Sequence, residues 1–403
     1  MEVVNDLQSF DVVVIGGGPS GATAAHDLAR QGRSVLLIDK AGRIKPCGGA
    51  IPPRLVKDFE IPDHIIVAKI SAARMVSPKD KRVDMPIDGG YVGMVDRDVF
   101  DEYLRTRAEE AGAVRLTATF DRVETAADGS AIVHYNPGPE RHTGPTRQVR
   151  ARVVIGADGA RSTVAKQTIP GAEKMKYVFA YHEIVRTPEA GSKADFNPKS
   201  CDVIYRGSLS PDFYSWVFPH GDTTSIGTGT THKGTSLRDA VGTLRQDMGL
   251  TEVETLRREG APIPLRPLKR WDNGRNVVLA GDSAGVVAPA SGEGIYYAMY
   301  GGRLAAQAAE AFCATGDVRA LGLARKRFMK AHGRVFWILG IMERFWYSSD
   351  KRRESFVKIC QDRDVQRLTW ESYMNKELTR RDPMAHVRIF FKDMAHLLGL
   401  ARA

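Results

Sequence analysis

A glycine-rich turn near the N-terminus limits what this chain can fold into more than any other stretch does. Residues 11–15 read as a short buried strand, and a Gly-Gly-Gly-Pro-Ser-Gly turn (residues 16–21) follows directly. Residues 22–31 have the composition of a helix, and residues 34–38 that of a second strand, which ends at Asp39. Strand, Gly-x-Gly-x-x-Gly turn, helix, strand and acid stand in the order that a dinucleotide-binding fold requires.

Each residue type in this unit has a physical role. Gly16 permits the tight turn, Gly18 lets the backbone approach a pyrophosphate, and Gly21 lets the helix pack close to the strand. The helix N-terminus offers backbone N–H groups and a positive dipole end to phosphates. Asp39 can accept hydrogen bonds from an adenosine ribose, and its charge disfavours a 2′-phosphate. These features do not separate FAD from NAD.

Composition places the chain among ordinary globular proteins. Its 403 residues suffice for two or three domains, and 43% are hydrophobic. The four cysteines are widely spaced, so neither a zinc site nor a disulfide framework is predicted, and a reducing cytoplasm fits best. The N-terminal residues lack a basic-then-apolar leader, so no signal peptide is expected. No apolar run approaches the ~20 residues that span a bilayer.

Positive charge is concentrated in the C-terminal fifth. Residues 325–403 hold 18 Lys and Arg against 9 Asp and Glu, in a chain of net charge +10, and three of its five tryptophans. Residues 387–398 place apolar and basic side chains on opposite faces of a predicted helix. We expect peripheral association of residues 335–342 and 387–398 with an anionic membrane surface. Packing on the protein's own core and docking of a partner protein are the alternatives.

Two later segments repeat the pattern of strand and glycine-rich turn, at residues 153–162 and 276–285. They place Asp158 and Asp282 at the carboxyl ends of buried strands, where open α/β sheets bind ligands. Asp282 can accept a hydrogen bond from a ribityl hydroxyl. Residues 289–295 then lead into a long helix, whose first backbone N–H groups can meet the polar edge of a flavin.

Three other features allow both a structural and a functional interpretation. Arg97 stands in the first turn of a predicted helix, where a cation is unfavourable, so it is either an exposed arginine or a phosphate ligand. Tyr214, Trp216 and Phe218 share one face of a predicted strand, which is either plain core or the wall of an apolar tunnel. Cys47 lies in a Lys-Pro-Cys-Gly-Gly loop, either as a structural cysteine or close to a flat ligand.

The three glycine-rich segments resemble those of the FAD-dependent family that includes p-hydroxybenzoate hydroxylase, in the same order and at similar distances. The resemblance implies an α/β fold (α+β overall), with a Rossmann-type FAD-binding domain and an inserted, mostly antiparallel β substrate domain. We expect the FAD-binding domain at residues 1–66, 95–172 and 268–325, the substrate domain at 67–94 and 173–267, and a C-terminal helical region at 326–403. The implied cofactor-binding residues are Gly16, Gly18, Pro19, Gly21, Asp39, Cys47, Gly48, Ala50, Arg97, Val123, Asp158, Gly281, Asp282, Gly292, Gly294 and Ile295.

The Cys47 loop and the aromatic strand together resemble the geranylgeranyl reductase family, in its chlorophyll and bacteriochlorophyll branch. The resemblance implies stepwise saturation of three of the four double bonds of a geranylgeranyl group, giving phytyl. The group would be carried by a diphosphate or by the pigment ester. FAD would deliver the hydride, and NADPH would recharge the flavin, binding transiently because we find no second dinucleotide motif. Cys47 would face the flavin and position or relay a proton, and the substrate channel would be lined by Tyr214, Trp216 and Phe218.

Two functions of other kinds share these features. A flavin hydroxylase acting on an aromatic ring would carry the same three FAD segments. A non-catalytic, flavin-stabilised membrane scaffold would also keep them, although intact cofactor motifs argue against it. Beyond the prenyl substrate and the membrane, the resemblance suggests bacteriochlorophyll synthase as a partner, and no nucleic-acid partner is expected.

Overall fold

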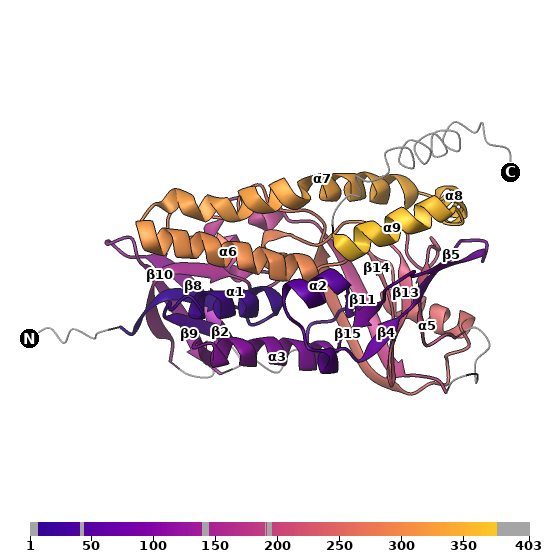
Figure 1. Cartoon of the computed structure of the whole chain (residues 1–403), viewed down its shortest axis with the longest axis horizontal. Coiled ribbons are helices and arrows are strands. Elements are labelled where there is room, and N and C mark those ends of the chain that lie inside the picture. The colour runs from indigo at the N-terminus through magenta and orange to yellow at the C-terminus, as the bar shows by residue number, and fades with distance from the viewer. Residues whose placement is uncertain (1–6, 41–43, 139–144, 190, 192–195, 377–403) are drawn as a thin grey trace, which may run out of the picture. The chain divides into compact units, whose positions relative to one another are not determined.

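The computed structural model describes residues 7–40, 44–138, 145–189, 191 and 196–376 (Figure 1). Contacts within the chain divide it into two compact units. Unit 1 is made of Met1–Lys45, Arg97–Tyr177 and Pro262–Phe336, and unit 2 of Pro46–Asp96, Val178–Ala261 and Trp337–Ala403. The predicted α/β fold class is confirmed, and the three-part domain division stays a prediction.

Unit 1 is built on a six-stranded sheet. In pairing order its strands are β1 (Ser9–Ile15), β2 (Val35–Asp39), β8 (Val114–Thr125), β9 (Ala131–Pro137), β10 (Arg147–Gly156) and β16 (Val277–Leu279). β1 pairs in parallel with β2 and β10, and β10 does so with β16. The Val-, Ile- and Leu-rich runs of these strands are buried, as expected for a parallel sheet covered on both faces.

Strands β8 and β10 are long because each pairs in parallel along one part of its length and antiparallel along another. The first residues of β8 pair in parallel with β2, and residues 118–125 pair antiparallel with β9. β10 pairs antiparallel with β9 through its first residues and parallel with β1 through its last. The sheet therefore closes on itself through β9. The strand predicted at the start of residues 153–162 is the end of this longer strand, which begins at Arg147.

Glycines allow helix α1 (Pro19–Ala29) to pack tightly on α6 (Ile295–Thr315) (Figure 1). A Cβ atom on Gly302 would lie 2.2 Å from the backbone oxygen of Ser20, and one on Gly281 would lie 2.7 Å from the Cβ atom of Ser20. Both distances are too short for any side chain. Backbone contact with α6 therefore holds the N-terminus of α1, which begins at Pro19, three residues earlier than predicted.

Interlocking rings hold α6 to α7 (Leu323–Trp346). Tyr297 contacts Phe328, His332 and Phe336 edge-on, at centroid distances of 6.1, 5.2 and 4.9 Å. Trp271 closes the cluster against Phe328 at 5.1 Å. Edge-to-face pairs contribute about 0.5–1.5 kcal/mol each beyond the burial of their area, so this cluster fixes the start of α7. Among the described residues of unit 1, the other α-helices are α3 (Arg97–Glu110) and α4 (Thr163–Thr168).

Unit 2 is built on a seven-stranded sheet that is mostly antiparallel, as the family resemblance implies. In pairing order its strands are β15 (Thr255–Pro264), β11 (Tyr177–Arg186), β14 (Thr223–Thr230), β13 (Ser215–His220), β12 (Ser200–Ile204), β5 (Ala72–Val76) and β6 (Arg82–Pro86). β12 and β5 pair in parallel. A smaller antiparallel sheet consists of β3 (Ala50–Ile51), β7 (Val92–Met94) and β4 (Ala68–Ile70).

Helices cover the strands of unit 2. Val241 and Leu244 of α5 (Leu237–Asp247) pack on Val217 and Ile226 of the large sheet. α9 (Arg363–Asn375) packs Trp370, Tyr373 and Met374 on a buried cluster that includes residues of the small sheet. The remaining helices described in this unit are α2 (Pro53–Asp58) and α8 (Asp350–Ile359).

Two observations bear on the expected association with a membrane. Residues 387–398, which were expected to form an amphipathic helix, lie outside the described residues. Within the part of the chain that the structure describes, every helix is too short or too polar to cross a bilayer.

The α1–α6 contact makes a testable prediction about stability. Gly302→Ala should lower the free energy of unfolding by about 1–3 kcal/mol, because its methyl group would overlap the Ser20 carbonyl. Gly242→Ala is the matched control, since this glycine is exposed in α5 with no atom near its Cβ position. It should raise stability by about 0.5–1 kcal/mol through helix propensity alone. Urea denaturation measures both, and stabilisation by both would contradict the packing described.

Candidate functional site

The glycine-rich turn of unit 1 leaves open space at the start of α1. Gly16 has φ +102°, and a Cβ atom there would lie 2.4 Å from the backbone oxygen of Ala157. A Cβ atom on Gly21 would lie 1.8 Å from the backbone oxygen of Gly16, so packing requires both glycines. Gly18 differs, because its φ of −72° and ψ of −179° suit any residue and a Cβ atom would meet no atom within 4 Å. The fold therefore does not require glycine at Gly18, and the close approach of a pyrophosphate there stays a prediction.

Side chains from β2 and α3 hold the turn in place. Asp39 accepts a hydrogen bond from the backbone N–H of Gly17 at 2.7 Å, and Arg105 donates to the Gly17 carbonyl at 3.2 Å. Glu102 in turn accepts from Arg105 and Arg115. Hydrogen bonds from these guanidinium groups lower the pKa of Glu102 to about 2, so the carboxylate is ionised at neutral pH. One oxygen of the predicted ribose ligand Asp39 thus also shapes the turn.

The two predicted aspartates after β10 and β16 have different surroundings. Asp158 accepts hydrogen bonds from the Ser162 hydroxyl at 2.5 Å and the Thr163 N–H at 2.6 Å, and so caps α4. Burial raises its pKa. Asp282 is buried and forms an ion pair with the more exposed Lys45. A ribityl hydroxyl would therefore meet a carboxylate whose charge is already balanced.

Arg97 is buried and is paired with another side chain of the protein. It is 6% exposed, and its Nε and Nη2 atoms donate to the two carboxylate oxygens of Asp101 at 2.8 and 2.7 Å. This bidentate pair, four residues apart on α3, offsets the unfavourable position of a cation in the first helical turn. A contact between Arg97 and an FAD phosphate stays a prediction.

The other predicted cofactor residues of unit 1 lie at the ends of elements. Gly281 follows β16 with φ +65°, and Gly292 has φ +63° in the loop before α6. Gly294 is the N-cap of α6, and Ile295 is its buried first residue. Val123, in β8, donates its N–H to Gln167 at 3.2 Å.

These features of unit 1 fit an FAD cofactor. The open space at Gly18 adjoins the first N–H groups of α1, and Gly294 leaves the start of α6 without a side chain. Helix N-termini of this kind bind phosphates and other anionic groups. Bound FAD would supply hydride chemistry, and the chain would supply the backbone donors.

The aromatic strand of unit 2 forms one continuous face. The rings of Tyr214 and Trp216 are 6.0 Å apart, and those of Trp216 and Phe218 are 6.3 Å apart. The Trp216 indole N–H donates to the Ser225 hydroxyl at 3.0 Å. A Cβ atom on Gly227 would lie 2.2 Å from the Trp216 ring, so the neighbouring strand β14 makes room for the indole with glycine. Tyr214 immediately precedes β13, whereas the predicted strand included it.

The Cys47 loop lies against this face. A Cβ atom on Gly48 would lie 3.1 Å from the ring of Phe218. His220 faces the Gly48 carbonyl with Nε2 at 3.0 Å and the Asp96 carboxylate with Nδ1 at 3.2 Å. Cys47 is half-buried and carries a free thiol, which accepts a hydrogen bond from the Gly49 N–H at 3.4 Å. Unit 2 therefore brings the cysteine together with the aromatic residues, and Ala50 follows in β3.

Sequence reasoning missed several residues that position these groups. Lys45 and Asp282 stand 237 positions apart, and nothing in either segment indicates their pairing. Arg105 and Gln167 are similarly unmarked. His220 could have been found, because it continues the alternation of Trp216 and Phe218 along β13.

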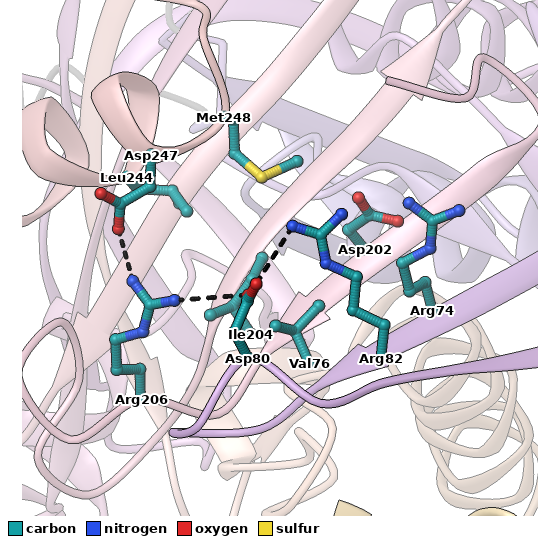
Figure 2. Close-up of a pocket in the computed structure, with 10 residues that line it drawn as sticks. All are labelled: Arg74, Val76, Asp80, Arg82, Asp202, Ile204, Arg206, Leu244, Asp247 and Met248. Carbon is teal, nitrogen blue, oxygen red and sulfur yellow. Dashed lines mark hydrogen bonds and ion pairs between the residues drawn. The ribbon is translucent and has the colours of Figure 1, made fainter. Parts of the chain in front are cut away.

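A pocket of about 250 Å³ opens in unit 2 (Figure 2). Three arginines and three aspartates contribute to its lining, so the charge is balanced. Arg206 pairs with Asp247 and, at 3.7 Å, with Asp80, while Arg82 pairs with Asp80 at 3.3 Å. None of the predicted site residues is among those that line it, and its polarity does not suit a prenyl chain.

Comparisons with known proteins support the family resemblance found in the sequence. A family described as lycopene cyclase protein matches residues 11–396. The geranylgeranyl diphosphate reductase of Rhodobacter capsulatus is 56% identical over 97% of this chain and 98% of the relative. A chloroplastic geranylgeranyl diphosphate reductase of Oryza sativa subsp. japonica is 36% identical over 96% of this chain and 86% of the relative. Both relatives confirm the resemblance inferred from the sequence.

Solved structures share the fold. A geranylgeranyl bacteriochlorophyll reductase-like protein from Thermoplasma acidophilum has a TM-score of 0.81 at 21% identity, covering 97% of this chain and 99% of that protein. A flavin-dependent brominase has a TM-score of 0.75 at 17% identity, covering 96% of this chain and 99% of that protein. The fold is thus one used by flavin-dependent enzymes.

The open space at Gly18 leads to a prediction about flavin binding. Gly18→Val should fold normally but weaken FAD binding at least about tenfold, or about 1.4 kcal/mol, because the side chain would occupy the space assigned to the pyrophosphate. Gly90→Val is the control, since Gly90 is exposed in unit 2 and has ordinary backbone angles. Flavin absorbance per folded protein measures the effect. Full flavin occupancy in Gly18→Val would count against the assignment.

Proposed function

Because this chain belongs to the family of the geranylgeranyl diphosphate reductases, we propose that it is a flavin-dependent reductase of geranylgeranyl groups. The reaction saturates three of the four double bonds to give phytyl, with geranylgeranyl diphosphate or the geranylgeranyl ester of bacteriochlorophyll as substrate. The observation that carries the proposal is the 56% identity to the Rhodobacter capsulatus relative, which extends over 97% of the chain. The similarity therefore includes the Cys47 loop and the aromatic strand as well as the FAD segments.

In this proposal unit 1 holds FAD, which supplies the hydride. The phosphates lie at Gly16, Gly18, Pro19 and Gly21, and Asp39 binds the ribose. Arg97, Val123, Asp158, Gly281, Asp282, Gly292, Gly294 and Ile295 complete the proposed cofactor site. NADPH is the proposed reductant of the flavin.

Unit 2 holds the prenyl chain in this proposal. An isolated alkene is unactivated, so the enzyme gains rate mainly by fixing its position and excluding water. The apolar face of Tyr214, Trp216 and Phe218 offers such a surface, and Tyr214 and Trp216 are almost wholly buried. Cys47 lies at the Phe218 end of this face, next to Gly48, where its thiol can position or relay a proton.

Product analysis without oxygen tests the function against a flavin hydroxylase. FAD-loaded protein is incubated with NADPH and either geranylgeranyl diphosphate or the pigment ester, and products are identified by mass spectrometry. We expect products that have gained two, four and six hydrogens in sequence, because each step adds a hydride and a proton. A hydroxylase needs oxygen and cannot act under these conditions. Absence of reduced product from both substrates would refute the proposal.

The position of Cys47 leads to a prediction about chemistry rather than folding. Cys47→Ala and Cys47→Ser should keep FAD and the unfolding midpoint, because the thiol is half-buried and makes only a weak hydrogen bond to Gly49. Reduction should slow by roughly 10²-fold or stall at partly reduced products, if the thiol handles the proton. Cys360→Ser, at a buried thiol, is the contrasting variant and should lower stability instead. Unchanged turnover and products in both Cys47 variants would contradict this role.

An exposed apolar patch on α7 supports peripheral membrane association, which we propose as the way the enzyme reaches a lipid-soluble substrate. Trp337 and Ile341, one turn apart, are 67% and 47% exposed, and exposed Arg334 and Arg344 flank them. A tryptophan and an isoleucine can enter the headgroup region while arginines contact anionic lipid. Each such cation contributes ~1 kcal/mol near the surface.

Liposome flotation tests this patch. Wild-type protein should float with anionic liposomes at low salt and less at high salt, and Trp337→Ser with Ile341→Ser should reduce flotation. Val99→Ser with Leu256→Ser, which removes two exposed apolar residues elsewhere, is the control. Failure of folded, FAD-bound wild type to float with anionic or neutral liposomes at either salt would remove the membrane role. Docking of a protein such as bacteriochlorophyll synthase would then be the remaining use of the patch.

A further inference from the structure

Tyr214 of the aromatic face also belongs to a row of three tyrosines in unit 2. The ring of Tyr205 is 6.2 Å from that of Tyr214 and 5.4 Å from that of Tyr347. All three tyrosines are buried. Phe356 of α8 covers Tyr205 edge-on at 5.1 Å, which adds an apolar wall to the row. Three phenol hydroxyl groups therefore lie near one another, although the proposed hydride chemistry alone does not require them.

The hydroxyl groups of this row interact electrostatically. Those of Tyr205 and Tyr347 form a hydrogen bond with each other. The hydroxyl of Tyr214 lies within electrostatic range of both the Tyr347 hydroxyl and the Cys47 thiol. Burial raises the pKa of each phenol, so all three stay neutral at physiological pH. A neutral phenol can pass a proton by accepting one and donating another, but it does not store charge.

Glu343 interacts electrostatically with the Tyr347 hydroxyl, at the Tyr347 end of the row. It precedes Tyr347 by one helical turn, and the Tyr347 N–H donates to the Glu343 carbonyl at 3.1 Å. The side chain is half-buried, so water can reach it. Burial and the nearby Asp212 carboxylate raise the pKa of Glu343 to about 7, so protonated and ionised forms coexist at neutral pH. Asp212 itself accepts hydrogen bonds from Thr230 and Thr231.

The other ionisable groups near the row do not offer an equivalent proton source. Cys360 and Cys201 interact electrostatically with the tyrosines, and both thiols are buried. Arg353 is buried and donates to the backbone carbonyls of Tyr347 and Pro211. It thereby ties α8 to the two segments that carry Tyr347 and Tyr214. His232 lies 3.8 Å from Asp212 on the exposed side.

We propose that Glu343 supplies the proton for each alkene reduction, through Tyr347, Tyr205 and Tyr214, to the Cys47 end of the aromatic face. The inference rests on the reductase function proposed above. The hydride from reduced flavin forms one new C–H bond as the π bond breaks, and a proton from the Cys47 thiol forms the other. The thiol is reprotonated along the row, Glu343 is left as a carboxylate, and water reloads it. Electrons come only from the flavin, which NADPH reduces again.

The route explains why an otherwise apolar wall contains three neighbouring hydroxyl groups. A prenyl channel that excludes water also excludes the usual proton source, so a fixed path from the surface is needed. Above a pH of about 7 the Glu343 carboxyl loses its proton, and alkene reduction should therefore slow as pH rises through this value.

The test separates the two half-reactions of the FAD-loaded full chain without oxygen. Flavin reduction by NADPH and flavin reoxidation by geranylgeranyl diphosphate are followed between about pH 6 and about pH 8, on either side of the pKa of Glu343. Glu343→Gln should slow reoxidation by roughly 10²-fold and abolish its pH dependence, leaving flavin reduction unchanged. Tyr347→Phe, which keeps the ring and removes the hydroxyl, should also slow reoxidation. Glu110→Gln, at an exposed end of α3, should match wild type.

An infrared titration gives a readout independent of turnover. A protonated carboxyl band that disappears near pH 7 in wild type should be missing from Glu343→Gln. The proposal is overturned if Glu343→Gln keeps the wild-type rate and pH profile, or if both half-reactions slow equally. It is also overturned if the band persists in Glu343→Gln. Failure of wild-type protein to reoxidise with the prenyl substrate would instead refute the reductase function, and the route with it.

Discussion

Close approach of one backbone to another is the constraint on which unit 1 depends. Gly21 brings α1 against the carbonyl of Gly16, Gly16 brings β1 against Ala157, and Gly302 brings α6 against Ser20. Each contact is too short to admit a side chain. Together they fix the N-terminus of α1 relative to the ends of β1 and β10. The turn between these fixed points leaves Gly18 as a glycine whose surroundings are open, and the proposed pyrophosphate site follows from that geometry.

In unit 2 polar atoms beside an apolar surface stay hydrogen-bonded. The aromatic face is backed by hydrogen bonds from Trp216 to Ser225 and from Ser215 to Thr228. His220 ends the same strand and holds the Cys47 loop through the Gly48 carbonyl. Because the strand and the loop share these contacts, the position of the thiol depends on the strand that would hold the prenyl chain. This explains why both segments carry the family resemblance.

The sequence predicted the local patterns well, because periodicity and turn chemistry are local properties. The glycine-rich turn, the parallel strands and the shared face of Trp216 and Phe218 all followed from spacing alone. Pairings between distant segments did not, since no local signal indicates that Lys45 meets Asp282. The tyrosine row was likewise hidden. Tyr205, Tyr214 and Tyr347 come from separate segments, and only packing brings their rings close together.

The central claim is that a flavin held by unit 1 reduces a prenyl alkene. The most direct measurement is the fate of the reduced flavin when oxygen is absent. The flavin is reduced with NADPH, excess reductant is removed, and a geranylgeranyl substrate or its phytyl counterpart is added while absorbance is recorded. The account predicts that the geranylgeranyl substrate restores the oxidised spectrum and the phytyl counterpart does not. A flavin that stays reduced with both, and reoxidises only when oxygen is admitted, would contradict it.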